Sequence, residues 1–228
     1  MRFRWIAAFG ILLMAGTAGS EVVVLETQKD KVSYGIGMNI GNSLKRDVVD
    51  VDVDLLVKGL KDGLSGDNTL MSEEEYRVTM MALQKEMMEK QAAAAKALAE
   101  KNKQEEEAFL AENGKKEGVV TLPSGLQYKV IRSGTGKSPK PGDTVETHYR
   151  GTLIDGTEFD SSYKRGQTAT FPVSGVIPGW TEALQKMKEG DKWQLFVPSS
   201  LAYGERGAGR NIGPNSTLIF EVELIAVK

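Results

Sequence analysis

The amino-acid sequence predicts an α+β protein with an all-α N-terminal region, a long stalk helix and a C-terminal curled antiparallel sheet over one short helix. Three observations predict this fold. Residues 73–113 contain neither proline nor glycine and are rich in Ala, Glu, Lys, Gln, Met and Leu, as one long helix would be. After Gly118 the apolar pattern changes from a period of 3.6 to a period of 2, which indicates strands. Residues 175–184 then join a Pro-Gly corner to a short helical pattern.

The first 20 residues are predicted to be a signal peptide. Arg2 and Arg4 precede an apolar run at residues 5–14 and small residues at 15–20. A retained membrane anchor is the alternative, but this apolar run is too short to span a bilayer comfortably. Cleavage after Ala18 or Ser20 would leave an exported protein, in the periplasm or at the outer membrane surface. The chain has no cysteine, so we expect no lipoprotein, disulfide or thiolate chemistry.

The charge and the scarcity of ligand residues exclude several classes of function. Acidic and basic residues number 31 and 29, so no basic field indicates a nucleic-acid partner. Asp50, Asp52 and Asp54 alternate like the start of a calcium loop, but the Gly and Glu that such a loop needs are missing. His148 is the only histidine and is expected to face away from its neighbour Tyr149, at the surface. We therefore expect neither a metal nor a cofactor.

The N-terminal half is predicted to join two copies of the chain. Residues 32–44 and 53–64 show helical apolar stripes, and Gly37 and Gly41 indicate either close approach of a neighbouring backbone or a weak helix. Two short helices bury little alone, so a homodimer through residues 21–114 is expected. A client-binding surface is the alternative use of the methionines here, which are Met38, Met71, Met80, Met81, Met87 and Met88.

The helix at 73–113 has two unlike parts. Ser72 and Glu75 form a predicted capping box at its start, and about 40 residues would make a rod of roughly 60 Å. Its first part has an apolar stripe and is expected to pack in the dimer core. From Met88 onward few large apolar residues remain, which predicts a solvated stalk that ends at Gly114.

The C-terminal half carries an ordered set of motifs at residues 149–151, 155–162, 176–180, 202–204 and 218–224. Their sequences are Tyr-Arg-Gly, Asp-Gly-Thr-Glu-Phe-Asp-Ser-Ser, Val-Ile-Pro-Gly-Trp, Ala-Tyr-Gly and Leu-Ile-Phe-Glu-Val-Glu-Leu. Over residues 119–228 this order resembles the FKBP family of peptidyl-prolyl cis-trans isomerases. The helical N-terminal half and the Leu-Pro-Ser-Gly-Leu-Gln-Tyr junction at 122–128 are similar to the exported, dimeric Mip and FkpA-like branch.

The resemblance implies which residues form the site. Its catalytic group would be Tyr149, Phe159, Asp160 and Tyr203, and its substrate-binding group would be Val176, Ile177, Trp180, Ile212, Phe220 and Arg165. Trp180 would form the floor of the pocket. Each aromatic taken alone is more often plain core, but the joint pattern favours the pocket. Ala169 and Ala208 depart from the family, which often has larger side chains there, so the rim is expected to be more open. The family also implies macrolide inhibitors.

The chemistry implied needs no nucleophile. Rotation about a peptide bond has a barrier of ~18–20 kcal/mol, and for X–Pro the two isomers lie within about 1 kcal/mol of each other. A dry aromatic pocket favours the twisted, less polar amide and holds the proline ring. The Tyr203 hydroxyl could bind the substrate carbonyl. Asp160 either orients Tyr149 or faces the twisted amide, and the sequence leaves this choice open.

The domain boundaries expected are a signal peptide at 1–20, a dimerisation region at 21–71, a connecting helix at 72–114 and an isomerase domain at 119–228. The predicted function is isomerisation of X–Pro bonds in exported, unfolded or partly folded polypeptide clients, with chaperone activity. The alternative is a dimeric periplasmic holding chaperone or peptide-binding module with incidental isomerase activity.

Overall fold

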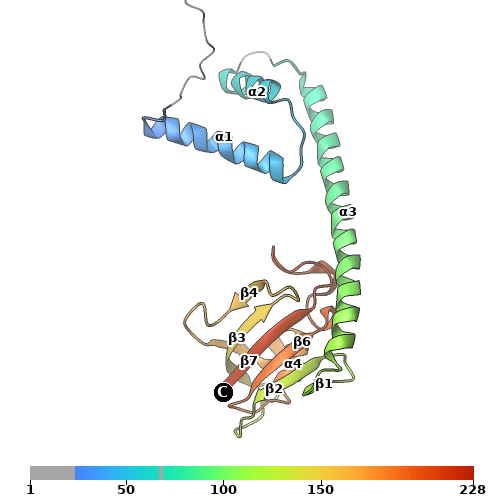
Figure 1. Ribbon diagram of the computed structural model, residues 1–228. Helices are drawn as coiled ribbons and strands as arrows, with labels where there is room; N and C mark the ends of the chain where they lie inside the picture. Colours follow the sequence, from blue (N-terminus) through green and yellow to red (C-terminus); the bar gives the residue numbers. More distant parts are fainter. Residues whose placement is uncertain (1–23, 67–68) are drawn as a thin grey trace, which may run out of the picture. The chain divides into compact units, whose positions relative to one another are not determined.

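The computed structural model describes residues 24–66 and 69–228, and the chain divides into two compact units, Met1–Tyr76 and Arg77–Lys228 (Figure 1). The predicted signal peptide lies outside the described residues. Within the described ranges, no helix is both long and apolar enough to cross a membrane.

The N-terminal unit contains α1 (Gln28–Arg46) and α2 (Val53–Ser65). The first helix begins four residues before Val32, where the apolar stripe that predicts it starts. The cause is a capping box, in which the Asp30 N–H donates to Thr27 Oγ1 (3.1 Å) and the Thr27 N–H donates to Asp30 (2.8 Å). Asp52 caps α2 by accepting the Leu55 N–H at 3.0 Å, which gives it a structural role.

The apolar stripes of α1 and α2 remain largely exposed in the part of the chain that the structure describes. Neither helix has a buried residue. Val32, Ile36 and Leu60 are 50, 56 and 52 % exposed, although they lie at core-type spacing. An α-carbon substituent on Gly37 or Gly41 would meet nothing within 4 Å. These two helices therefore lack the partner surface that their sequence pattern predicts.

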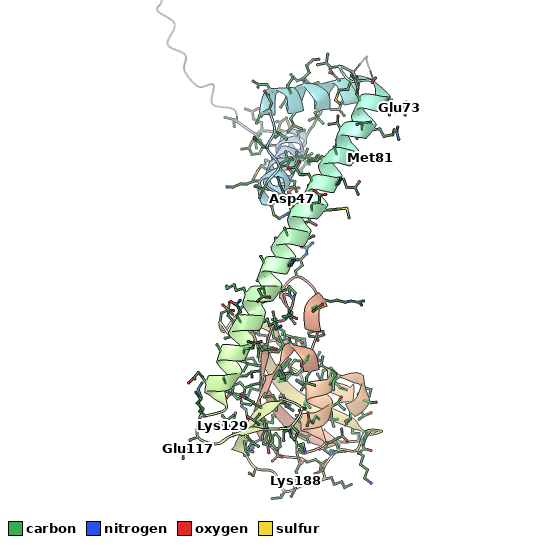
Figure 2. All side chains as sticks on the ribbon, turned by 90° about the vertical axis from the view of Figure 1, so that its right-hand side faces the viewer. Asp47, Glu73, Met81, Glu117, Lys129 and Lys188 are labelled. Atoms are coloured by element: carbon green, nitrogen blue, oxygen red, sulfur yellow. The ribbon has the colours of Figure 1, made fainter. Side chains whose placement is uncertain are left out.

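The long helix α3 (Glu73–Asn113) has the predicted bounds. The Ser72 hydroxyl accepts the Glu75 N–H at 3.2 Å, and the Glu75 carboxylate accepts the Ser72 N–H at 2.8 Å, which confirms the capping box. At the other end the Gly114 N–H still donates to the Leu110 carbonyl, and the chain turns into the sheet. Figure 2 shows Glu117 and Lys129 near the foot of this helix.

The C-terminal unit is built on one antiparallel sheet. Its strands are β1 (Val119–Thr121), β2 (Gln127–Arg132), β3 (Thr144–Thr152), β4 (Glu158–Ser161), β5 (Ala169–Pro172), β6 (Lys192–Val197) and β7 (Leu218–Val227). Their order is β1-β2-β6-β7-β3-β4, and β5 also pairs with β3. β4 pairs with the last residues of β3, and β5 pairs with its first residues. The chain between β4 and β5 therefore leaves the edge of the sheet beside the centre of β3.

A short helix, α4 (Pro178–Leu184), covers the inner face of this sheet (Figure 1). Pro178 stands at the first helical position, where its missing N–H costs nothing. Trp180, Leu184 and Met187 are 4, 1 and 0 % exposed, which confirms that they face inward together. A side chain on Gly179 would lie 2.5 Å from Val197 Cγ1, so glycine is what lets α4 approach β6.

The last part of α3 is not the solvated stalk that its composition predicts. Phe109 packs on Phe196 of β6, with ring centroids 5.9 Å apart. Asn113 is 1 % exposed and donates to the Gln127 side chain at 3.0 Å, while Gln127 donates to the Leu110 carbonyl at 2.8 Å. Polar side chains anchor this helix to the sheet, and a search for apolar stripes does not detect them.

Candidate active site

The candidate site begins with the pairing of β3 and β7. Tyr149 and Gly151 face the same side of β3, and Gly151 lies opposite Phe220 in the register. A Cβ on Gly151 would lie 2.6 Å from the Phe159 ring and 2.8 Å from the Phe220 ring. No side chain fits between these rings and the strand, so a glycine is required where the two aromatics cross the sheet.

A β-bulge brings two adjacent residues to the site. Asp160 pairs with Gly151 and Glu158 pairs with Thr152, so Phe159 is an extra residue on β4. Neighbouring residues of a regular strand face opposite sides, and a bulge removes that constraint. Phe159 therefore contacts Phe220 in a T-shaped pair at 5.5 Å, while Asp160 reaches Tyr149.

Trp180 is the centre of an aromatic cluster. Its ring lies 5.3 Å from Tyr149, 5.2 Å from Phe220 and 5.9 Å from Phe171, each in an edge-to-face arrangement. Such pairs are favourable beyond the area they bury. The buried Trp180 Nε1 has no hydrogen-bond partner in the described part of the chain. The cluster is therefore largely apolar, apart from that indole N–H group and the Tyr149 hydroxyl.

Phe171 is a site residue that the sequence reasoning missed. It contacts both Tyr149 and Trp180, and it lies two residues after Ala169 on β5. The alternation of a strand places residues i and i+2 on one face. That signal could have found Phe171, because Ala169 was already assigned to the wall of the pocket.

Tyr149, Asp160 and Arg165 form a hydrogen-bonded group at one edge of the cluster. The Tyr149 hydroxyl donates to one Asp160 oxygen at 2.5 Å, and Arg165 forms an ion pair with the other oxygen. A second Arg165 nitrogen donates to the Tyr149 hydroxyl at 2.8 Å. The guanidinium also lies 5.5 Å from the centroid of the Tyr149 ring. Three side chains from β3, β4 and the following loop thus fix one another.

The environment shifts the pKa values of this group. Partial burial by itself raises the pKa of Asp160, but the hydrogen bonds from Tyr149 and Arg165 outweigh it and hold that pKa below its usual value. Burial raises the pKa of Tyr149, and the hydrogen bond to the Asp160 carboxylate raises it further. Asp160 is therefore an anion and Tyr149 a neutral donor at neutral pH.

The remaining predicted residues come from two loops. Val176 and Ile177 end the corner before α4, are half-buried and pack against the core. Ile212 is 9 % exposed, and its backbone pairs with that of Ala208 at 2.8 and 3.2 Å. Tyr203 lies in the same loop and is 42 % exposed, so it is the most accessible aromatic of the predicted set.

His148 differs from its prediction in one respect. It does face away from Tyr149, but it is half-buried, because its ring stacks on Tyr163 at 4.7 Å and Nδ1 contacts the Ser162 hydroxyl at 3.0 Å. Across residues 24–66 and 69–228 no group of His, Cys, Asp and Glu side chains could hold a metal ion.

Comparison with known proteins shows which family the chain matches. A profile described as FKBP-type peptidyl-prolyl cis-trans isomerase matches residues 135–225, and one described as the domain amino terminal to such isomerases matches residues 29–130. The chain is 48 % identical to "Outer membrane protein MIP" of Legionella longbeachae over 228 residues, covering 100 % of this chain and 98 % of that protein. It is 46 % identical to "Peptidyl-prolyl cis-trans isomerase Mip" of Coxiella burnetii, covering 95 % and 94 %.

A solved structure agrees with these matches. The crystal structure of FkpA from Escherichia coli matches with a TM-score of 0.71 and 39 % identity, covering 90 % of this chain and 99 % of that one. Both halves of the chain are therefore accounted for. The motifs at 149–151, 155–162, 176–180 and 218–224 include residues of β3, β4, α4 and β7, which build the aromatic cluster, and the motif at 202–204 lies in the loop between β6 and β7. The chain belongs to the family of FKBP-type peptidyl-prolyl cis-trans isomerases and acts on X–Pro bonds of polypeptides.

Proposed function

We propose that isomerisation takes place at the aromatic cluster around Trp180. The observation that carries this proposal is the set of edge-to-face rings on Trp180 beside the Tyr149–Asp160–Arg165 group. The catalytic residues are Tyr149, Phe159, Asp160 and Tyr203, and the residues that bind the substrate are Val176, Ile177, Trp180, Ile212, Phe220 and Arg165.

The cluster suits rotation about an amide bond. Twisting the amide breaks its resonance and reduces the charge on the carbonyl, so apolar walls favour the twisted form over the planar form. In this proposal the proline ring packs on Trp180, and Phe159 and Phe220 exclude water beside it. The exposed Tyr203 hydroxyl binds the carbonyl oxygen of the substrate.

Asp160 acts in this scheme by orienting Tyr149. Both of its carboxylate oxygens are engaged, one by Tyr149 and the other by Arg165. Two of the roughly four acceptor sites of the carboxylate are thereby used to hold Tyr149 and Arg165 in place. Of the two roles that the sequence leaves open for Asp160, the hydrogen bonds favour the orienting role.

The N-terminal unit is proposed to form a homodimer through residues 21–114. Its support is the exposed apolar surface of α1 and α2, together with the open space beside Gly37 and Gly41. Exposed stripes of this kind are the usual sign of a protein–protein interface. The proposed division of the chain is dimerisation at 21–71, connection at 72–114 and isomerisation at 119–228, after a signal peptide at 1–20.

The proposed setting is the periplasm or the outer membrane surface, where the protein acts on unfolded or partly folded clients and also keeps them from aggregating. The signal-like start of the chain and the outer membrane protein among its relatives support an exported protein. Macrolides that bind this family are proposed inhibitors. The second candidate function, a holding chaperone with incidental isomerase activity, is favoured by the exposed apolar residues of α1 and α2.

The test is cis-to-trans exchange in a short X–Pro peptide, measured by NMR with purified residues 21–228. Asp160→Ala and Tyr203→Phe are expected to lower kcat/KM by about tenfold or more. Tyr163→Phe is the matched control, because Tyr163 is 43 % exposed and Tyr203 is 42 % exposed. If the parent and the three variants were equally active, isomerisation would not take place at this cluster. An inactive parent that is folded would favour the holding function.

A further inference from the structure

The segment between β6 and β7, residues 198–217, carries both Tyr203 and Ile212 and is held at its two ends by one side chain of α3. The Glu106 carboxylate accepts the Ser199 N–H at 2.6 Å and the Ser199 hydroxyl at 3.1 Å. It also accepts the Thr217 hydroxyl at 2.9 Å. The last pair of β6 and β7 is Val197 with Leu218. Ser199 comes two residues after Val197 and Thr217 comes directly before Leu218, so Glu106 joins the two ends of the loop, which we call its neck.

The neck is a shielded place for such an interaction. Ser199 is 7 % exposed and Thr217 is 2 % exposed. Hydrogen bonds to an ionised group are stronger than neutral ones, and a buried donor that loses its acceptor is costly. Three donors on one carboxylate therefore tie both ends of the loop to α3.

A second set of bonds runs from α3 towards Tyr203. Asn102, one turn before Glu106, donates to the Pro214 carbonyl at 2.7 Å, and Asn215 donates to the Ala99 carbonyl at 3.3 Å. The Asn215 N–H donates to the carbonyl of Gly204 at 2.8 Å, and Gly204 directly follows Tyr203. The returning arm of the loop thus connects the helix to the residue beside Tyr203.

A cavity of about 380 Å³ lies between α3 and the loop, and its lining includes Asn102, Gly213, Ser216 and Thr217. Where side chains do not fill the space, the position of a loop depends on the few bonds that cross it. Glu106 and Asn102 supply those bonds from one face of the helix.

We propose that Glu106 is a positioning residue for isomerisation, which acts through Ser199 and Thr217 to set the loop that carries Tyr203 and Ile212. This inference rests on the proposed site. It assigns the last four turns of α3 to the catalytic body, although their composition resembles a solvated stalk. A helix that links two parts of the chain thereby also determines the geometry of the substrate-binding loop.

The test compares Glu106→Gln with Glu107→Gln in purified residues 21–228. Glu107 is the next residue and is exposed, so it matches the change in charge without touching the loop. Glu106→Gln is expected to lower kcat/KM by about tenfold, because small displacements of binding groups are costly in catalysis. Glu107→Gln is expected to stay within about twofold of the parent.

A panel of peptides that differ in the residue before proline separates positioning from plain stability. A smaller folded fraction lowers the rate for every peptide by the same factor, whereas a displaced loop changes their ranking and KM. Thr217→Val should reproduce part of the change and add little to Glu106→Gln, since both act on one contact. The inference is overturned if the parent is active and Glu106→Gln keeps its rate, or loses rate equally for all peptides. An inactive parent would instead overturn the proposed site.

Discussion

The two units of this chain differ in how much of their own apolar surface they bury. In Arg77–Lys228, residues such as Leu126, Val145 and Leu224 have no exposed surface, and α4 closes the sheet. In α1 and α2, the residues at core-type spacing remain exposed and none is buried. The same kind of pattern therefore serves two purposes. One unit completes its core within a single copy, and the other presents exposed apolar surface, which the proposed homodimer would cover.

The largest expected effect is on the proposed dimer interface of the N-terminal unit. Ile36→Asp places a carboxylate in the proposed interface, which costs several kcal/mol when it is desolvated without a partner. Sedimentation should show a dimer for the parent and a monomer for the variant, with the dissociation constant raised more than about 100-fold. Ile131→Asp is the control, since Ile131 is 50 % exposed on β2 of the other unit. A parent that sediments as a monomer at micromolar concentration would sink the proposed dimer.

The next effect concerns the aromatic cluster alone. Phe159→Ala removes a ring that packs against Phe220, so kcat/KM for an X–Pro peptide should fall by about ten- to 100-fold. Suppression of client aggregation should be unchanged, because the exposed apolar residues that favour a holding function lie on α1 and α2 and not in this cluster. Loss of both activities in a folded variant would show that the two functions share one surface.

A smaller effect, on stability, is expected at Gly151, which lies beneath the Phe159 and Phe220 rings. Gly151→Ala would bring Cβ to 2.6 Å from Phe159, so we expect the C-terminal unit to lose about 2 kcal/mol of stability in urea unfolding. Gly142→Ala is the matched control, because nothing lies within 4 Å of the added Cβ there. Equal midpoints for the two variants would contradict the packing described at β3 and β7.

The smallest effect is on the dependence of stability on pH. The pKa of Asp160 is lower in the folded protein than its usual value, so its charge contributes stability above about pH 4 that is lost as pH falls through the folded value. Urea midpoints of the parent and Asp160→Asn should therefore differ at pH 6 and converge below about pH 4. If the difference between the two midpoints grew on acidification, the pKa of Asp160 would be raised by folding and not lowered.

The sequence was most informative where the signals are local. The capping box at Ser72, the uninterrupted composition of residues 73–113 and the inward spacing of Trp180, Leu184 and Met187 all depend on neighbours within a few turns. These features determine the bounds of α3 and the side of α4 that faces the sheet. The strand alternation and the ordered motifs likewise predicted the curled sheet and the family.

The missed features depend on distant partners. Asn102 and Glu106 look like solvated helix residues until the loop at 214–217 is placed beside them. The bulge that turns both Phe159 and Asp160 to one side is a property of the pairing with β3 and not of β4 alone. Long-range polar contacts and register shifts leave little trace in local periodicity, so these features appeared only in the structure.

The aromatic cluster lies within a single chain, so we propose that catalysis needs one copy, whereas protection of clients needs the proposed homodimer. The most direct test measures X–Pro exchange per chain and client aggregation with the same preparation of the Ile36→Asp variant. We predict a kcat/KM within about twofold of the parent and a loss of most of the protection. If the monomeric variant lost its isomerase activity, or protected clients as well as the parent does, the division between the two units would be wrong.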